Sequence, residues 1–162
     1  MSENLEVRIA RLEDLDALKK VINVYHQRAD RFDWNAWAES FTEDSVFVFA
    51  ESFGTMTGRQ QILDICRDSM DHIYGVMQHI MINLDFELTG QDTATGHGNL
   101  IFTGIPDAAK PDQFVQSGGR YDWQFRRTPD GWRIAHSQLE FIWNNGGDSD
   151  DVFASKDAAE AA

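Results

Sequence analysis

The second half of the chain is a succession of long strand-like segments, and no other feature limits the possible folds as strongly. These segments are rich in β-branched and aromatic residues, and short turn-forming sequences separate them. The strands are expected over residues 76–88, 93–102, 114–127 and 132–143, with a hairpin turn at Thr128-Pro129-Asp130-Gly131 before the last. Consecutive strands with short turns pair antiparallel. The sequence therefore predicts an antiparallel sheet over this half.

Helical patterns come before the strands. From Leu12 onward, apolar residues recur every three or four positions as far as Phe32, which predicts an amphipathic helix with one buried face. A short helical piece is expected to hold Trp34, Trp37 and Phe41. A strand then follows at residues 45–50, and another helix at residues 60–70.

Helices followed by a run of strands predict an α+β fold. Four glycines inside the strands indicate bends or bulges, namely Gly96, Gly98, Gly118 and Gly119. We therefore expect a cone-shaped barrel, in which a strongly curved antiparallel sheet wraps on the N-terminal helices and encloses a pocket. The domain is expected over residues 11–145, after an N-terminal arm (1–10) and before an acidic flexible tail (146–162).

The charge of the chain argues against nucleic acid and anionic membrane surfaces as partners. With 27 acidic and 14 basic side chains, the formal net charge is −13, and such a field repels phosphate groups. No window approaches the roughly 20 apolar residues of a membrane span. Cys66 is the only cysteine, and residues 1–6 have neither a basic lead nor an apolar run. These features together predict a cytoplasmic protein.

One histidine is placed where it could do acid–base chemistry. His79 begins a strongly apolar strand-like run, about fifty residues after the helix that carries Asp30. Histidine is the side chain most easily set to exchange protons near neutral pH. A carboxylate against one ring nitrogen would fix the tautomer and raise the basicity of the other. If Asp30 and His79 meet in a pocket, the chain has the minimum equipment for this chemistry.

Two features of the pattern leave this pairing open. On an ideal helix, Asp33 lies nearer than Asp30 to the centre of the apolar stripe, so Asp33 is an alternative partner. On the strand, Ile80 and its apolar neighbours Ile82, Leu84 and Phe86 alternate with His79. His79 would therefore point away from a pocket on the Ile80 side unless a bulge shifts the register.

Several short patterns occur in an order that resembles the SnoaL-like branch of the nuclear transport factor 2-like superfamily. The resemblance covers roughly residues 10–145. Its patterns are Tyr25-xxx-Ala29-Asp30-xx-Asp33-Trp34, Phe41-Thr42-Glu43-Asp44-Ser45, Thr57-Gly58-Arg59, Gln78-His79-xxx-Asn83, Gly90-Gln91-Asp92-Thr93-Ala94 and Asp130-Gly131-Trp132-Arg133-Ile134. The branch includes scytalone dehydratase, bile-acid 7α-dehydratase, hexachlorocyclohexane dehydrochlorinase and polyketide cyclases.

The resemblance implies a cofactor-free lyase or isomerase that acts on a small hydrophobic cyclic or polyketide-like substrate. In the lyases a His–Asp pair transfers the proton, and these positions fall on His79 and Asp30. The resemblance also implies self-association as a dimer or trimer. An alternative follows from the same fold, which resembles the small subunit of aromatic-ring hydroxylating dioxygenases. That alternative is a non-catalytic ligand-binding or structural subunit.

The remaining candidate residues would bind the substrate. Hydroxyl and imidazole groups of Tyr25, Tyr121 and His97 could donate to a developing oxyanion or to a departing hydroxyl. Trp37, Phe102 and Trp123 are expected in an aromatic lining that excludes water. His26 falls near the margin of the first helix's apolar stripe and is a weaker candidate. No metal site is expected, because the chain has no closely spaced ligand set, and no Gly-rich loop indicates a nucleotide.

Overall fold

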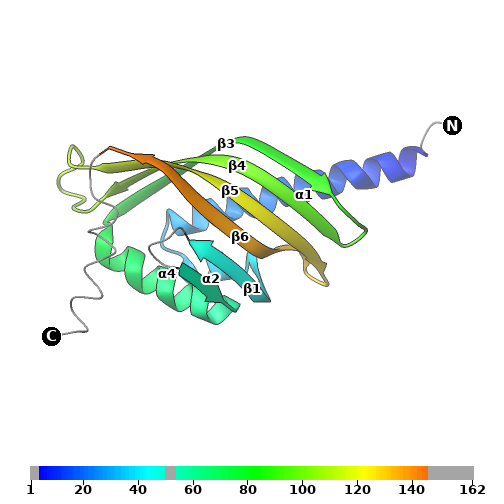
Figure 1. Cartoon of the computed structure of the whole chain (residues 1–162), viewed down its shortest axis with the longest axis horizontal. Coiled ribbons are helices and arrows are strands. Elements are labelled where there is room, and N and C mark those ends of the chain that lie inside the picture. The colour runs from blue at the N-terminus through cyan, green and yellow to red at the C-terminus, as the bar shows by residue number, and fades with distance from the viewer. Residues whose placement is uncertain (1–3, 50–53, 146–162) are drawn as a thin grey trace.

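The computed structural model describes residues 4–49 and 54–145, so the predicted acidic tail lies outside the described residues. Within these residues, three helices and six strands form an α+β fold (Figure 1). The helices are α1 (Leu5–Ala29), α2 (Trp34–Ala38) and α4 (Arg59–Ile73). The strands are β1 (Phe41–Phe49), β2 (Gly54–Thr57), β3 (Val76–Leu88), β4 (Thr93–Ile105), β5 (Val115–Thr128) and β6 (Gly131–Asn144).

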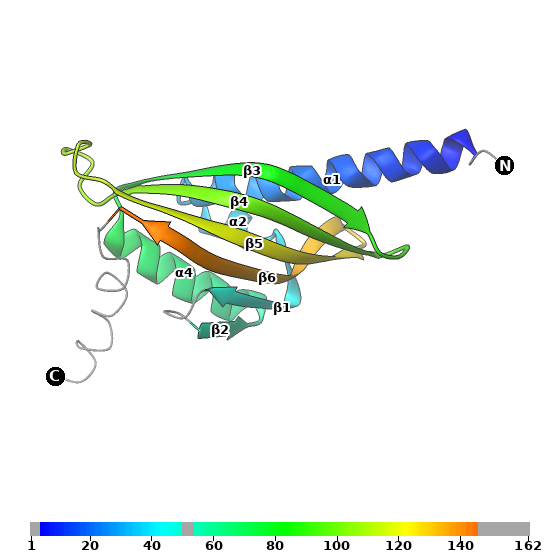
Figure 2. The ribbon, with the colours of Figure 1, turned by 45° about the horizontal axis from the view of Figure 1, so that its top comes forward.

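All six strands form a single curved sheet in the order β2-β1-β6-β5-β4-β3. The sheet is open, with β2 and β3 at its edges. Figures 1 and 2 show the long strands curving over α1, while α4 lies under one end of the sheet. Helix α1 contacts β3 and β6, and α4 packs against β1 and α2. The helices therefore cover the concave face of the sheet, as the order of the predicted elements suggested.

The four long strands lie where the sequence predicted them, but three details differ. Helix α1 begins at Leu5 and not near Leu12, so most of the predicted arm is helix. Asn4 caps it by accepting a hydrogen bond from the Glu6 amide (3.3 Å). The added turns extend beyond the sheet (Figure 2), and their residues Leu5 and Ile9 are exposed, so they have no buried face for periodicity to reveal. Leu12 is exposed as well and does not belong to the buried face that was predicted to begin with it.

The second difference is that Phe41 opens a strand and does not close a helix. The amide of Ile134 donates to the carbonyl of Ser40 (2.8 Å), which brings the chain into β1 alongside β6. The third difference follows directly, because β1 pairs with β6 in parallel, whereas all other neighbours in the sheet are antiparallel. Strands β1 and β6 are far apart in the sequence, so local sequence pattern could not predict that they pair.

A bulge in β3 determines which side chains of this strand face the helices. The register with β4 shifts between Ile82 and Asp85, and Asn83 has a positive φ of 54°. Before the bulge, Met77, His79 and Met81 face inward; after it, Leu84 and Phe86 do. The isoleucines Ile80 and Ile82 lie on the outer face, each more than 40% exposed.

Strand β4 accommodates the bulge by having no side chain opposite it. A Cβ atom on Gly98 would lie 2.7 Å from Leu84 and 3.2 Å from the Trp123 ring. The sequence predicted a bend at this glycine; the bulge lies across from it, in β3, and Gly98 provides the space. The core beneath the sheet joins α1 residues Leu18, Ile22, Tyr25 and Ala29 to the aromatic side chains of β5.

Candidate active site

The end of α1 brings one carboxylate to the sheet. Asp30 is the C-cap residue, and its amide still donates to the carbonyl of His26 (3.0 Å). The chain then turns through Phe32, whose φ is 57°. Asp33 therefore does not continue the helical stripe, and its carboxylate pairs with Arg28 instead. An ideal helix extended to residue 33 would place Asp33 on the buried face. This placement is wrong, because the helix ends at Ala29.

Asp30 contacts both the backbone and the ring of His79. Its Oδ1 lies 2.5 Å from the ring Nδ1, and both carboxylate oxygens accept from the His79 amide at 3.1 Å. Strand β3 is an edge strand, so this amide has no neighbouring strand on that side, and the carboxylate takes the place of one. The His79 and Asp30 side chains are 16% and 23% exposed. Two segments 49 residues apart thus meet at a half-buried site.

This contact determines which ring nitrogen of His79 is available for chemistry. An ionised carboxylate only accepts hydrogen bonds, so the Nδ1 beside Asp30 is the protonated one. In the neutral imidazole, Nε2 then carries a free lone pair. The ring is also flanked by two other rings, with centroid distances of 4.8 Å to Phe102 and 5.1 Å to His26. This arrangement orients a base and fixes its tautomer.

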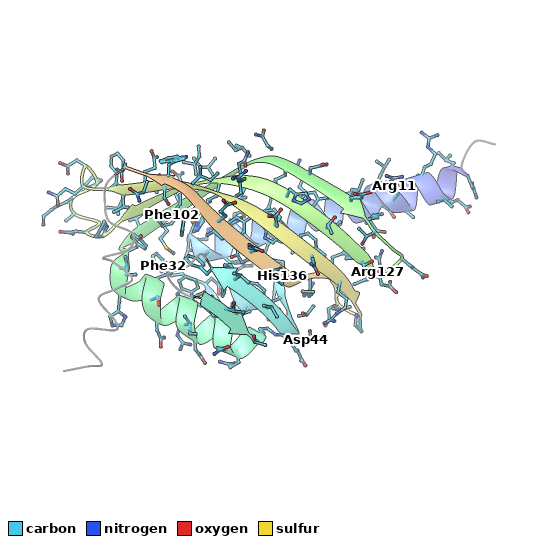
Figure 3. The ribbon with its side chains drawn as sticks, in the orientation of Figure 1. Arg11, Phe32, Asp44, Phe102, Arg127 and His136 are labelled. Atoms are coloured by element: carbon cyan, nitrogen blue, oxygen red, sulfur yellow. The ribbon has the colours of Figure 1, made fainter. Side chains whose placement is uncertain are left out.

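His79 lines a narrow apolar pocket of about 40 Å³. Phe102, labelled in Figure 3, lies in this part of the molecule, toward the end of the sheet that α4 covers. The other lining residues are Phe49, Met70, Tyr74, Leu100, Tyr121, Leu139 and Phe141. A volume of this size holds one or a few waters, whereas drug-sized ligands occupy about 300–1,000 Å³. A ring compound would enter this pocket only if side chains moved aside.

Two tyrosines of the pocket wall are kept protonated. Burial raises the pKa of Tyr74 to about 12 and holds the pKa of Tyr121 well above its ordinary value. A neutral phenol can donate a hydrogen bond to an oxygen that gains negative charge. None of the nine lining residues carries a formal charge at neutral pH apart from the titratable His79. The pocket therefore suits an uncharged ligand.

The structure brings only some of the predicted residues to the pocket. Tyr121 and Phe102 line it, but Trp123 lies behind Tyr121, stacked on it at 5.0 Å. Tyr25 and Trp37 pack against each other in the core, 5.4 Å apart, and neither lines the pocket.

His97 lies on the face of the sheet away from the pocket, so it does not make the substrate contact that was predicted for it. Its side chain is 64% exposed and pairs through Nδ1 with Asp122 of the neighbouring strand. In β4 the residues that face the helices are Leu100 and Phe102, and His97 has the opposite parity.

Tyr74 lines the pocket but was not among the predicted residues, and His26, predicted near the margin of the apolar stripe, is buried. Tyr74 follows the end of α4, where no apolar periodicity marks it. His26 is only 4% exposed, because it follows Ile22 by four residues and precedes Ala29 by three, on the buried side of α1. That spacing was visible in the sequence.

Other kinds of site gain no support from the residues described. Within residues 4–49 and 54–145, no three histidine, cysteine or acidic side chains are grouped closely enough to share a metal ion. Among the described helices, none combines the length and the apolar character needed to cross a bilayer.

Comparison with solved structures shows the same architecture in several proteins. A protein from Novosphingobium aromaticivorans, provisionally named a scytalone dehydratase, is 16% identical with a TM-score of 0.75, over 83% of this chain and 88% of that one. A hexachlorocyclohexane dehydrochlorinase, LinA type 3 from Novosphingobium barchaimii, is 17% identical with a TM-score of 0.75, over 87% and 96%. A provisionally named aromatic ring hydroxylase from N. aromaticivorans is 24% identical with a TM-score of 0.73, over 82% and 91%.

At these identities the likeness establishes the fold and leaves the activity open. A comparison with curated proteins finds no match. The family is clear from the sequence itself, because the model of the SnoaL-like domain matches residues 10–138. The chain belongs to the family of SnoaL-like domains.

Proposed function

We propose that this protein is a cofactor-free lyase or isomerase of the dehydratase type, in which His79 is the base and Asp30 orients it. The observation that carries the proposal is the 2.5 Å contact between His79 Nδ1 and Asp30 Oδ1 beside an apolar pocket. The contact leaves Nε2 to take a proton from carbon next to a carbonyl. General base catalysis of this kind contributes roughly 10²–10⁴ in rate.

The remaining groups have defined roles in this reaction. As Nε2 takes the proton, the imidazole becomes positively charged, and the adjacent carboxylate stabilises that charge. A phenol of Tyr121 or Tyr74 donates to the oxygen that gains electron density or leaves as hydroxide. The departing hydroxide takes the proton from the His79 imidazolium, so water is released, the neutral imidazole is restored and the elimination needs no redox change.

The substrate class follows from the lining of the pocket. Eight of its nine residues are aromatic or aliphatic, and His79 is the ninth. We therefore propose a small, uncharged, hydrophobic compound with a ring or polyketide-like chain and a carbonyl oxygen. The dehydratase and dehydrochlorinase names of the structural neighbours agree with this class of chemistry.

The test is a screen of cyclic β-hydroxy ketones with the full-length protein. Dehydration forms a conjugated enone, whose ultraviolet absorbance reports turnover directly. We expect the wild type to convert at least one compound and His79→Ala to convert it roughly 10²–10⁴ times more slowly, with unchanged circular dichroism. Full activity of the His79→Ala protein on the same compound would refute the assignment.

A non-catalytic role is the second candidate, and the small volume of the pocket favours it. A site of about 40 Å³ resembles a nearly filled core more than a substrate chamber. One structural neighbour is named as an aromatic ring hydroxylase, a class in which this fold also serves as a partner subunit. Failure of every ketone in the screen, combined with stable binding to a larger oxygenase subunit, would support this candidate.

Self-association is part of either proposal. Large apolar side chains are exposed on the outer face of the sheet and on the extension of α1, and such surfaces are typical of interfaces. They include Ile80, Ile82, Ile142 and Trp143 on the sheet and Leu5, Ile9 and Leu12 on the helix. We propose a dimer or trimer, which native mass spectrometry of the full-length protein would identify; a monomer at micromolar concentration would contradict it.

A further inference from the structure

His26 is a buried imidazole without hydrogen-bond partners. It is 4% exposed, and within the described residues neither Nδ1 nor Nε2 has a partner. Buried polar groups in proteins are nearly always hydrogen-bonded, and leaving one unpaired costs stability. A residue that served only to fill space would have no reason to be histidine. Among the described residues nothing pairs these two nitrogens, so they are available to a ligand.

The surroundings of His26 show where that partner would come from. Its ring lies 5.1 Å from the ring of His79 and 5.6 Å from that of Tyr121, measured between centroids. Both of these neighbours line the apolar pocket. On the other side the ring of Tyr25 packs edge-on at 4.6 Å. His26 is thus directly behind the pocket wall that carries the base.

The same surroundings keep His26 uncharged. Burial is the main cause that holds its pKa well below the ordinary value, and the neighbouring His79 adds to the effect because two positive imidazoles repel. A neutral imidazole has one N–H donor and one acceptor nitrogen. A hydroxyl group can donate to the acceptor nitrogen or accept from the N–H. A carboxylate can only accept and an ammonium ion can only donate, and either would bring a charge into an apolar site.

We propose that His26 is a hydrogen-bonding subsite for an uncharged ligand oxygen, reached between His79 and Tyr121. The subsite selects oxygenated compounds over hydrocarbons of the same shape. A bound ligand oxygen pairs one of the two unpartnered nitrogens of His26. This assignment is independent of whether His79 catalyses a reaction, so it stands apart from the proposed lyase activity.

Phenol and toluene are the probes that test it, because they share a ring and nearly the same shape and differ in a hydroxyl against a methyl group. Full-length protein carrying ¹⁵N-labelled histidine is titrated with each compound, and the ring nitrogen signals are followed by NMR. We expect phenol to shift the His26 signals and toluene to leave them in place. Unchanged His26 signals with phenol, or equal shifts with toluene, would overturn the subsite.

Two variants sharpen the test. His26→Phe keeps a flat ring but removes both polar nitrogens, so the preference for phenol over toluene should fall by about fivefold, the value of one ordinary hydrogen bond. The melting temperature of this variant should rise, because no unpaired polar atom remains at the position. His26→Gln retains a donor and an acceptor and should keep part of the preference.

The outcomes are distinguishable from those of the lyase proposal. A phenol preference that His26→Phe leaves unchanged would overturn the subsite even if His79→Ala abolishes turnover. Should the larger Phe ring prevent folding, the wild-type titration and His26→Gln decide the question alone. Loss of turnover in His79→Ala with intact His26 shifts would support both proposals separately.

Discussion

Residues 4–49 and 54–145 include two His–Asp pairs, one on each face of the same sheet, and they differ in almost everything but composition. His79 and Asp30 come from an edge strand and the end of a helix, and their side chains are 16% and 23% exposed. His97 and Asp122 come from neighbouring strands and are 64% and 61% exposed. In both pairs Nδ1 faces the carboxylate. The chemistry is therefore the same, and the environment is not.

The comparison shows what burial adds to a pair of titratable groups. In water, ions exchange their partner for solvent and salt at little cost, and exposed pairs contribute only about 0–1 kcal/mol. The inner pair is tied by three contacts, including two to the His79 amide, and adjoins an apolar pocket. The outer pair is thus a control for the inner one, within one chain.

The largest expected contrast is between the two histidines. His79→Ala should lower turnover of any compound that the wild type dehydrates by roughly 10²–10⁴, the usual contribution of a general base. His97→Ala should change turnover by less than about twofold, since an exposed side chain on the outer face does not contact the pocket. Initial rates of enone formation measure both effects. Comparable losses of turnover in the two variants would contradict the prediction that only the histidine on the inner face of the sheet takes part in the reaction.

Replacing the two aspartates should also affect turnover unequally, with the larger loss at Asp30, but the contrast should be smaller than for the histidines. Asp30→Asn should lower turnover by at least about 10–100-fold, the range for carboxylates that orient metal-bound histidines, because the amide no longer imposes one tautomer. Asp122→Asn should leave turnover unchanged and alter the free energy of unfolding by less than about 0.5 kcal/mol. A fully active Asp30→Asn protein with a normal circular dichroism spectrum would remove the orienting role of Asp30.

A third prediction concerns the bulge in β3, where the register with β4 shifts. Asn83 has φ of 54°, which costs an alanine about 1–2 kcal/mol and glycine nothing. Asn83→Ala should therefore lower the free energy of unfolding by about 1 kcal/mol in urea titrations, while Asn83→Gly should be close to the wild type. Equal stability of the two variants would mean that the backbone at residue 83 is not left-handed.

A fourth prediction concerns a carboxylate that joins α1 to the sheet without a histidine. Asp14 accepts hydrogen bonds from Arg127 (2.7 Å) and from the Trp132 indole (3.0 Å), near the end of the sheet away from Phe102, where Figure 3 labels Arg127. The hydrogen bond from Arg127 is the main cause that lowers the pKa of Asp14 below its usual 3.8. Asp14→Asn should cost about 1 kcal/mol at pH 7 and leave turnover unchanged.

The pH dependence of this effect has a definite sign. A lowered folded-state pKa gives stability that is complete above the unfolded pKa of about 3.9 and is lost as the pH falls through the folded value. The difference in unfolding free energy between wild type and Asp14→Asn should therefore shrink below about pH 4. Urea titrations at pH 7, 4 and 3 test it, and a difference that grows toward acid would contradict the ion pair.

Local sequence pattern was enough to predict the four long strands and the α+β class of the fold. Alternation and turn residues gave the four long strands, and β3 begins at Val76 and ends at Leu88 as predicted. These signals are local because a strand's period and a turn's backbone geometry depend on residues next to one another. The parallel contact of β1 with β6 was not predictable in that way, since its partners are distant in the sequence.

The candidate site shows the same division. The sequence by itself determined that a histidine opens an apolar strand and that two carboxylates lie near the end of the first helix. Only the tertiary structure decided that Asp30 and not Asp33 meets His79, because the helix ends at Ala29. It also decided that His79 faces inward and His97 outward. A strand's parity is relative, and which face becomes the inside depends on where the helices pack and where the bulge at Asn83 resets the register.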